Sequence, residues 1–344
     1  MGGLVEMIWP LSHKRYLTSR LAKAIFLKKS AKIEKYLNQF QDKSGMFHVV
    51  TSGTGSIPSD TCEVEFSSAG ITLLLGQLEA NSPRSTADRL IPLLPLFVHC
   101  HVAGARGRTI FSLWDRDYSP SVAFCSNLPS TLLIPDFEYL QSHAYREYER
   151  VLQKRVTNWA GRKPLAIWRG VTTGIANGPD WRNLPRVQLC EICARRPDLF
   201  DVGITGVVQL EQAREVESEL RSKKLMRPFM KRDYWGDFKY HIDIDGNSNA
   251  WSGLFTKLMT GSPVLKVASP GKFRQWYYDQ LQPFVNFVPV RSDLSDLLEK
   301  LLWLHANDDK AQVIGLAGRR LAKSLQFETE LGRARDAIVA RCRG

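Results

Sequence analysis

The sequence predicts an α/β protein with a parallel β-sheet in its C-terminal half. After residue 164, short runs of β-branched and aromatic residues alternate with amphipathic segments at the spacing typical of βαβ units. Before residue 157 the alternation is less regular. The chain has 344 residues, 44% of them hydrophobic, which suffices for about two domains. We therefore expect one α/β domain over residues 1–157 and a second over residues 158–344, whose last helix can pack back on the first.

The N-terminal half contains four predicted strands and three predicted helices. The strands are short and rich in β-branched or aromatic residues. The helices have apolar residues at helical spacing or form a nearly continuous apolar run. The strands are Phe47–Thr51, Cys62–Phe66, Arg108–Trp114 and Ser121–Cys125, and the helices are Tyr16–Phe40, Thr86–His101 and Leu140–Thr157.

The C-terminal half contains the regular alternation. Its strands are Leu165–Trp168, Leu199–Ile204, Tyr240–Ile244, Pro263–Val267 and Phe284–Pro289, and its helices are Leu184–Arg195, Val208–Arg221, Trp251–Thr260, Phe273–Leu281, Asp293–His305 and Lys310–Ser324. Parallel sheets bind ligands beyond the carboxyl ends of their strands. We therefore expect a site in the loops at Arg169–Gly174, Thr205, Asp245–Ser252 and Val267–Gly271.

The formal net charge of +12 is concentrated at the two ends of the chain. Met1–Phe40 contains eight Lys and Arg residues against two Glu, and Arg319–Gly344 contains seven against three acidic residues. A basic amphipathic end can lie on anionic lipid or nucleic acid, or it can be a solvated helix face. The sequence contains no helix-turn-helix, zinc module or RNA-binding aromatic motif, so nucleic acid is not an expected partner.

Cysteine usage and apolar runs bear on the compartment. Six scattered cysteines, several in apolar surroundings, predict free buried thiols in a reducing compartment. Cys190 and Cys193 lie within a predicted helix without a second Cys/His pair at zinc spacing, which disfavours a metal or redox site. The sequence shows no signal peptide, and no apolar run reaches the ~20 residues of a transmembrane helix. We expect a cytoplasmic protein.

The segment Lys239–Lys257 has the strongest site pattern, a strand followed by a polar loop and a helix that begins near Ala250. Free amides at a helix N-terminus, together with the helix dipole, suit a diphosphate. Lys257 lies about a turn and a half into the helix and can face the same ligand. In the alternative interpretation, the loop supplies only a turn and a helix N-cap. The loop residues are, in order, Asp245, Gly246, Asn247, Ser248 and Asn249.

Two further loops place charged or hydroxyl side chains at a strand end. In the first, glycines allow close backbone approach, hydroxyls can bind phosphate or ribose, and an arginine offers a two-pronged fork. In the second, Asp115 and Asp117 flank Arg116, and a carboxylate there can deprotonate an acceptor hydroxyl. The structural alternatives are a Gly-Thr turn and a solvated turn with a local ion pair. The first loop comprises Arg169, Gly170, Thr172 and Thr173.

Together these segments resemble glycosyltransferase family 90, which includes eukaryotic protein O-glucosyltransferases and xylosyltransferases and bacterial transferases acting on lipopolysaccharide or capsule. The similarity covers about Thr109 to Leu325, and its strongest stretch is Lys239–Lys266. Trp168-Arg169-Gly170 is similar to the family's aromatic-Arg-Gly loop. The ordered series comprises Ile242–Asn247, Gly261–Lys266, Trp276-Tyr277, Leu281–Val285, Val288–Val290, Asp293–Leu297 and Ala306–Asp309.

The resemblance implies a GT-B architecture, in which two Rossmann-like domains face a cleft, the N-terminal one on the acceptor side and the C-terminal one binding the nucleotide-sugar. It also implies inverting transfer of a hexose or pentose from a UDP-sugar to a saccharide or lipid-linked glycan acceptor, in lipopolysaccharide, capsule or other glycan synthesis. No cofactor or metal is expected. For a lipid-linked acceptor, the basic ends imply peripheral contact with the anionic inner face of the membrane.

The resemblance assigns roles to single residues. Asp117 matches the family's catalytic base. The matching donor-binding positions are Arg169, Gly170, Thr172, Thr173, Asp245, Gly246, Asn247, Ser248, Asn249 and Ser252, and we add Lys239 and Lys257 as donor contacts.

Two positions depart from the family pattern. Family members often carry arginines near the diphosphate where this chain has Thr172 and Asp245, and the Asp245 carboxylate would repel phosphate. Charge compensation for the departing UDP is then expected from Arg169, Lys239, Lys257 and helix amides. Asp245 itself could bind a ribose or sugar hydroxyl, or support a metal. The alternative functions are a catalytically degenerate nucleotide-sugar-binding scaffold and a basic nucleic-acid-binding protein.

Overall fold

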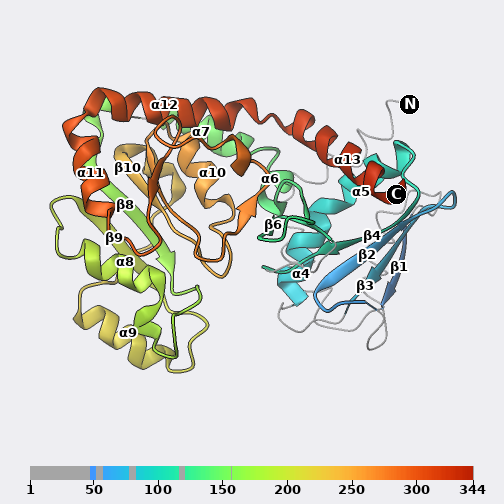
Figure 1. The fold of residues 1–344 in the computed structure, drawn as a ribbon, viewed down its shortest axis with the longest axis horizontal. Helices are drawn as coiled ribbons and strands as arrows, with labels where there is room; N and C mark the ends of the chain where they lie inside the picture. The colour runs from blue at the N-terminus through green and yellow to red at the C-terminus, as the bar shows by residue number, and fades with distance from the viewer. Residues whose placement is uncertain (1–46, 52–56, 77–82, 116–120, 156, 344) are drawn as a thin grey trace. The chain divides into compact units, whose positions relative to one another are not determined.

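The computed structural model describes residues 47–343 except 52–56, 77–82, 116–120 and 156 (Figure 1). The chain divides into two compact units, one formed by residues 1–144 with 326–344 and the other by residues 145–325. The helix predicted at Tyr16–Phe40 lies outside the described residues. The α/β class is confirmed, because each unit combines its own β-sheet with helices.

The first unit is built on a six-stranded sheet in the order β1-β3-β2-β4-β5-β7. The sheet is mixed, because β2 runs antiparallel to both β3 and β4 while the other neighbours pair in parallel. Ile71–Leu75, which the sequence analysis did not predict, lies between β1 and β2. The strands of this sheet are β1 Phe47–Thr51, β2 Thr61–Phe66, β3 Ile71–Leu75, β4 Gly107–Ser112, β5 Val122–Ala123 and β7 Leu132–Leu133, and the short strand β6 Cys125–Ser126 lies outside it.

Short helices accompany this sheet. The helix predicted at Thr86–His101 is divided around Pro92 into α4 (Pro83–Leu90), the 3-10 helix η2 (Ile91–Leu93) and α5 (Leu94–Val102). The C-terminal helix α13 (Phe327–Arg343) approaches β4 closely. A Cβ atom on Gly107 would lie 2.4 Å from the carbonyl oxygen of Cys342.

The single helix predicted at Leu140–Thr157 is wrong. It is two helices, α6 (Phe137–Gln141) in the first unit and α7 (Arg146–Arg155) in the second. His143, Ala144 and Tyr145 between them have φ of 50°, 56° and 57°. This left-handed conformation interrupts a right-handed helix. The break coincides with the division between the two units.

The second unit contains the predicted parallel sheet. Its strand order is β13-β11-β10-β8-β9, and all four neighbouring pairs are parallel. From β8 the chain moves outward to β9, and from β10 it moves the opposite way to β11 and β13. The strand order therefore reverses between β8 and β10. The strands are β8 Lys163–Val171, β9 Phe200–Gly206, β10 Phe238–Asp243, β11 Val264–Val267 and β13 Val288–Val290.

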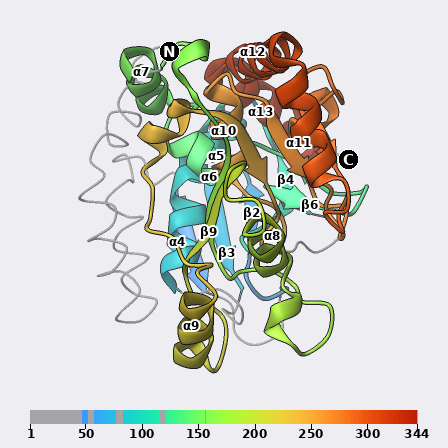
Figure 2. The same cartoon turned by 90° about the vertical axis from the view of Figure 1, so that its left-hand side faces the viewer.

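Helices α7 to α12 pack around this sheet, and Figures 1 and 2 place α9 at the opposite end of the unit from α12. The remaining α-helices of the unit are α8 Pro185–Cys193, α9 Ala213–Ser222, α10 Ser252–Met259, α11 Leu297–Ala306 and α12 Asp308–Ser324. The short elements are η3 Trp159–Gly161, η4 Trp181–Asn183, η5 Arg232–Asp237, η6 Tyr278–Gln280 and the strand β12 Arg274–Gln275.

The helix predicted at Phe273–Leu281 is also wrong, because β12 and η6 occupy this segment. The side-chain amide of Gln275 donates to the Asn249 side chain and to the Trp251 carbonyl at 3.1 and 3.0 Å. The next residues, Trp276 and Tyr277, both pack their rings against Phe255. Two consecutive residues directed at one neighbour do not follow the spacing of a helix face.

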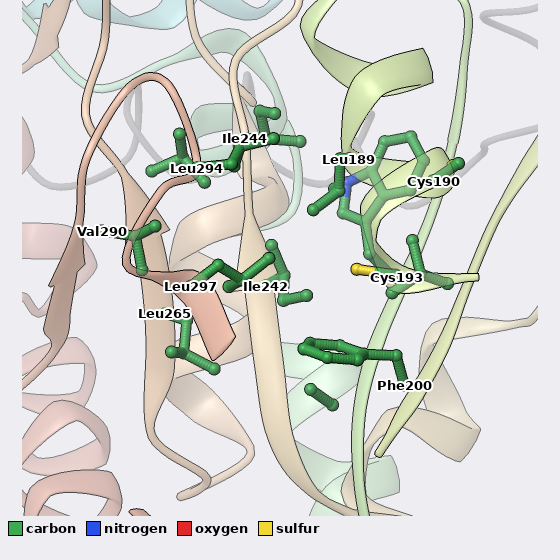
Figure 3. Close-up of a cluster of buried hydrophobic side chains, with 14 of the residues drawn as sticks. Leu189, Cys190, Cys193, Phe200, Ile242, Ile244, Leu265, Val290, Leu294 and Leu297 are labelled. Atoms are coloured by element: carbon green, nitrogen blue, oxygen red, sulfur yellow. The ribbon is translucent and has the colours of Figure 1, made fainter. Parts of the chain in front are cut away.

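The hydrophobic core of the second unit brings side chains of the sheet together with side chains of α8 and α11. Figure 3 shows Ile242 and Leu265 of the sheet together with Leu189 of α8 and Leu297 of α11. All six cysteines are free, and five of them are buried, as predicted. Cys190 and Cys193 belong to this apolar core.

Candidate functional site

A pocket of about 630 Å³ lies in the second unit at the carboxyl edge of its sheet. The loops that follow β8, β10, β11 and β13 line it, and the strand order reverses between β8 and β10. In open α/β sheets this edge, at a point of strand-order reversal, is where ligands bind. The lining residues are Ile175, Ala176, Asn177, Asn183, Pro185, Gln188, Ile244–Ser248, Val267–Gly271, Phe273, Ser292 and Asp293.

A buried charge cluster lies next to this pocket at the end of β10. The carboxylate of Asp243 is fully buried between two ammonium groups, with Lys257 Nζ 2.7 Å from Oδ1 and Lys266 Nζ 3.3 Å from Oδ2. Burial alone would raise the pKa of Asp243, but the two lysines outweigh it and hold the pKa below its usual value. Burial lowers the pKa of Lys257, against the opposing effect of Asp243. The cluster fixes α10 and β11 to the ligand edge of β10.

Asp245 is the buried carboxylate in the pocket wall, with only 8% of its surface exposed. Its nearest cation is Lys266, at 3.8 Å from Oδ1. Neither carboxylate oxygen has a hydrogen-bond partner of standard geometry among the described residues, and neither does Ser248 Oγ. Burial raises the pKa of Asp245, and Lys266, followed by the nearby Ser269 hydroxyl, opposes this rise. The wall therefore presents acceptor groups that a ligand could satisfy.

Arg186, which the sequence analysis missed, joins the two loops at the point where the strand order reverses. Its guanidinium donates to the carbonyl of Asp245 at 2.9 Å, to the carbonyl of Val171 at 3.2 Å and to Thr173 Oγ1 at 2.5 Å. Burial lowers the pKa of Arg186 to about 10, and Asp243 and Asp245 oppose the change. The sequence did contain a signal for Arg186, because it lies in the first turn of a predicted helix. A cation there is disfavoured by the helix dipole, so its presence indicates that it interacts with groups outside the helix.

The predicted donor residues at the end of β8 and in the loop after it are brought to the carboxyl edge, but their side chains bind other parts of the protein. Arg169 forms an ion pair with Asp201 on β9 at 2.7 Å. The Thr172 hydroxyl donates to the Val208 carbonyl and accepts from the Val208 amide, both at 2.8 Å. Glycine is required at position 170 because a Cβ atom there would lie 2.4 Å from the Trp168 ring.

The predicted residues after β10 surround the start of α10. Asn247 Oδ1 accepts from the Gly174 amide at 3.2 Å, which joins the loops after β8 and β10. Ser252 Oγ accepts from Arg232 at 2.9 Å. Trp251 precedes the helix with φ of 47°, and among the described residues no side chain caps the helix. The N-cap interpretation of Ser248 and Asn249 is therefore wrong. Gly246 lies where a Cβ atom would be 2.9 Å from Thr173 Oγ1.

Lys239 is not brought to this edge. It lies near the start of β10, whereas Asp245 follows the end of the strand. Its ammonium pairs with Asp308 at the start of α12 at 2.7 Å. The three predicted counter-charges, Arg169, Lys239 and Lys257, are thus all engaged in ion pairs.

Asp117 lies outside the described residues. Its neighbour Asp115 is paired with Arg89 at 2.6 Å. Across the described residues, no three His, Cys, Asp or Glu side chains gather as they would to hold a metal ion. Within the same part of the chain, no helix combines the length and apolar character needed to cross a membrane.

Comparison with known proteins bears on this region directly. The model of glycosyl transferase family 90 matches residues 86–329. Human protein O-glucosyltransferase 3 is 31% identical over 208 residues, which cover 60% of this chain and 38% of that protein. Rat protein O-glucosyltransferase 1 is 42% identical over 162 residues, covering 46% of this chain and 36% of the relative. Uncharacterized protein 027R of Frog virus 3 is 29% identical over 262 residues, which cover 68% of this chain and 27% of that protein. The chain thus spans less than half the length of these relatives.

Among solved structures, Anabaena HepE in complex with UDP-glucose is 11% identical, with a TM-score of 0.37 over 57% of this chain and 53% of that one. Sucrose-phosphate synthase from Thermosynechococcus elongatus is also 11% identical, with a TM-score of 0.38 over 89% of this chain and 92% of that one.

Proposed function

Because the chain belongs to glycosyltransferase family 90, we propose that it transfers a hexose or pentose from a UDP-sugar to a hydroxyl group, with inversion at the sugar. The observation that carries this proposal is the pocket at the carboxyl edge of the second sheet, which lies within the residues that match the family. Its volume of about 630 Å³ is in the range of small-molecule sites.

The charges around the pocket favour an anionic ligand. Arg186, Lys257 and Lys266 interact electrostatically with the carboxylates of Asp243 and Asp245, so three cations are set against two carboxylates. The excess positive charge is buried, where it acts strongly on a bound diphosphate. This arrangement replaces the sequence-based expectation that Arg169 and Lys239 supply the compensation, since both are paired elsewhere.

The proposed reaction is a single displacement. The acceptor oxygen attacks the anomeric carbon, the bond from that carbon to UDP breaks, and the acceptor proton passes to the carboxylate of Asp117. The names of the relatives favour glucose as the sugar and add a protein hydroxyl to the saccharide and lipid-linked acceptors that we consider. We place the reaction in lipopolysaccharide, capsule or other glycan synthesis.

The test combines donor binding with turnover. UDP-glucose, UDP-xylose and UDP-galactose are screened by thermal shift, and transfer is assayed on saccharide, lipid-linked and peptide acceptors. Asp117→Asn is expected to lower turnover by about 10²–10⁴-fold while the donor-linked rise in Tm stays unchanged. Asp309→Asn, at an exposed position on α12, is the matched control.

Three outcomes would change the assignment in different ways. A chain that binds none of these donors refutes the proposed function. Donor binding with no transfer to any acceptor supports the alternative of a catalytically degenerate scaffold. Full turnover by Asp117→Asn refutes the role of the base alone.

A further inference from the structure

The Asp245 carboxylate is buried in the pocket wall, where the nearby Ser269 hydroxyl lowers its pKa but does not reach standard hydrogen-bond geometry. Its exposed fraction is 8%, and both oxygens lack a partner of standard geometry among the described residues. Buried carboxylates are normally hydrogen-bonded, because otherwise the loss of hydration is uncompensated. Ser248, three residues later in the same wall, has 2% of its surface exposed and an unpartnered hydroxyl. The wall therefore contains at least three acceptor atoms that have no partner of standard geometry among the described residues and that a ligand can engage.

Three features restrict the chemistry of that ligand. It must donate hydrogen bonds, because a carboxylate only accepts them. It need not be a cation, because Lys266 lies 3.8 Å from Asp245 and already balances the charge in part. A diphosphate is excluded from this spot, since it carries negative charge and offers no hydrogen to donate at neutral pH.

Building on the proposed function, we propose that Asp245 binds two neighbouring hydroxyl groups of the donor, with one hydrogen bond to each carboxylate oxygen and a further one to Ser248. A vicinal diol presents two donors at the spacing of the two oxygens of a carboxylate. A UDP-sugar offers such diols on its ribose and on the transferred sugar. Asp245 is then a specificity-determining residue, and the diphosphate lies toward Arg186.

Titration calorimetry on the full chain tests this inference and separates the two diols. The ligands are UDP, 2′-deoxy-UDP and UDP-glucose, and the variants are Asp245→Asn and Ser248→Ala. Asp279→Asn, at a carboxylate with 82% of its side chain exposed, is the matched control. If the ribose is bound, the wild type prefers UDP to 2′-deoxy-UDP; if the sugar is bound, it prefers UDP-glucose to UDP. In either case Asp245→Asn weakens the preferred ligand by about 10- to 100-fold and removes the preference.

The controls give each outcome a distinct meaning. Ser248→Ala is expected to weaken the same ligand by about 3- to 10-fold, and this second variant keeps the test decisive if Asp245→Asn folds poorly. Equal weakening of all three ligands, or tighter binding of all three because repulsion of phosphate is relieved, overturns the inference while the proposed function stands. A wild-type chain that binds no uridine nucleotide overturns both.

Discussion

Replacing Asp243 by Asn would remove the negative charge that holds Lys257 and Lys266 at the ligand edge of β10. The carboxylate is fully buried, and the two ammonium nitrogens lie 2.7 and 3.3 Å from its two oxygens. Asn has nearly the same shape but no charge, so it leaves Lys257 and Lys266, together with Arg186, with the single carboxylate of Asp245. The side chains of α10 and β11 then lose the interaction that joins them to β10.

The expected loss is about 3–5 kcal/mol in the free energy of unfolding at pH 7, the usual cost of removing one partner of a buried ion pair. That is a large part of the 5–15 kcal/mol typical of a folded domain. Asp243→Asn with Lys257→Met is expected to lose at least about 1 kcal/mol less than Asp243→Asn alone, because the uncompensated ammonium is gone. Lys266 keeps Asp245 as a partner in this double variant.

Urea unfolding followed by tryptophan fluorescence measures these losses. Seven of the nine tryptophans lie in residues 145–325, so the signal reports mainly on the second unit. A loss below about 1 kcal/mol for Asp243→Asn, or no rescue in the double variant, would refute the reasoning.

The pH dependence provides an internal check. The pKa of Asp243 lies below its reference value of 3.8, so its stabilisation is present above that pH and is lost as the pH falls through the lowered pKa. The Asp243→Asn variant has no carboxyl group to protonate at this position, so it does not show this loss of stability at acid pH. Because burial holds the pKa of Lys257 below its reference value of 10.5, the deficit of the variant shrinks as the pH rises toward that value.

Two further predictions concern ligand and membrane binding. Arg186→Met is expected to weaken UDP-sugar binding by about 10- to 100-fold, because the loops after β8 and β10 lose the cation that joins them. A normal affinity measured by calorimetry would contradict this. Arg186→Lys keeps the charge but not the guanidinium fork, so its affinity is expected to lie between those of the wild type and Arg186→Met. We also expect the full chain to co-sediment with anionic vesicles more strongly than a chain lacking residues 1–40, since those residues contain eight Lys and Arg. Equal sedimentation of the two chains would rule out this role for the N-terminal segment.

Much of the second unit could be predicted from its sequence because its strands are buried apolar runs separated by amphipathic helices. The expected strands at Leu199–Ile204 and Tyr240–Ile244 are confirmed, with bounds within two residues. The first unit was harder to predict because its sheet is mixed and its elements are short. Its strand β3 follows a tight turn at Gly70 (φ 145°). This strand pairs with β1 on one side and β2 on the other, and the local sequence pattern does not indicate which strands are neighbours.

The edge of the sheet at which the pocket lies could be expected from the sequence, because parallel strands bring their carboxyl ends to one edge. Of the expected segments, Asp245–Ser252 and Val267–Gly271 contribute to the pocket lining, whereas Arg169–Gly174 and Thr205 do not.

The identities of the pocket's counter-charges could not be predicted in this way. Arg169 and Lys239 have the right chemistry in the sequence, but each has a nearer carboxylate in the fold, Asp201 and Asp308. Arg186 was missed because its partners are mainly backbone carbonyls, which every residue has and no sequence pattern marks.

The sequence by itself determined the α/β class, the parallel sheet of the second unit and the family, since each depends on local periodicity or on an ordered series of motifs. Only the tertiary structure decided which charges remain for a ligand. Ion pairs form between side chains that are far apart in sequence, such as Arg169 with Asp201 and Lys239 with Asp308. The same packing buried Asp245 beside Lys266 without a hydrogen bond of standard geometry among the described residues, and so left its carboxylate for a ligand to satisfy.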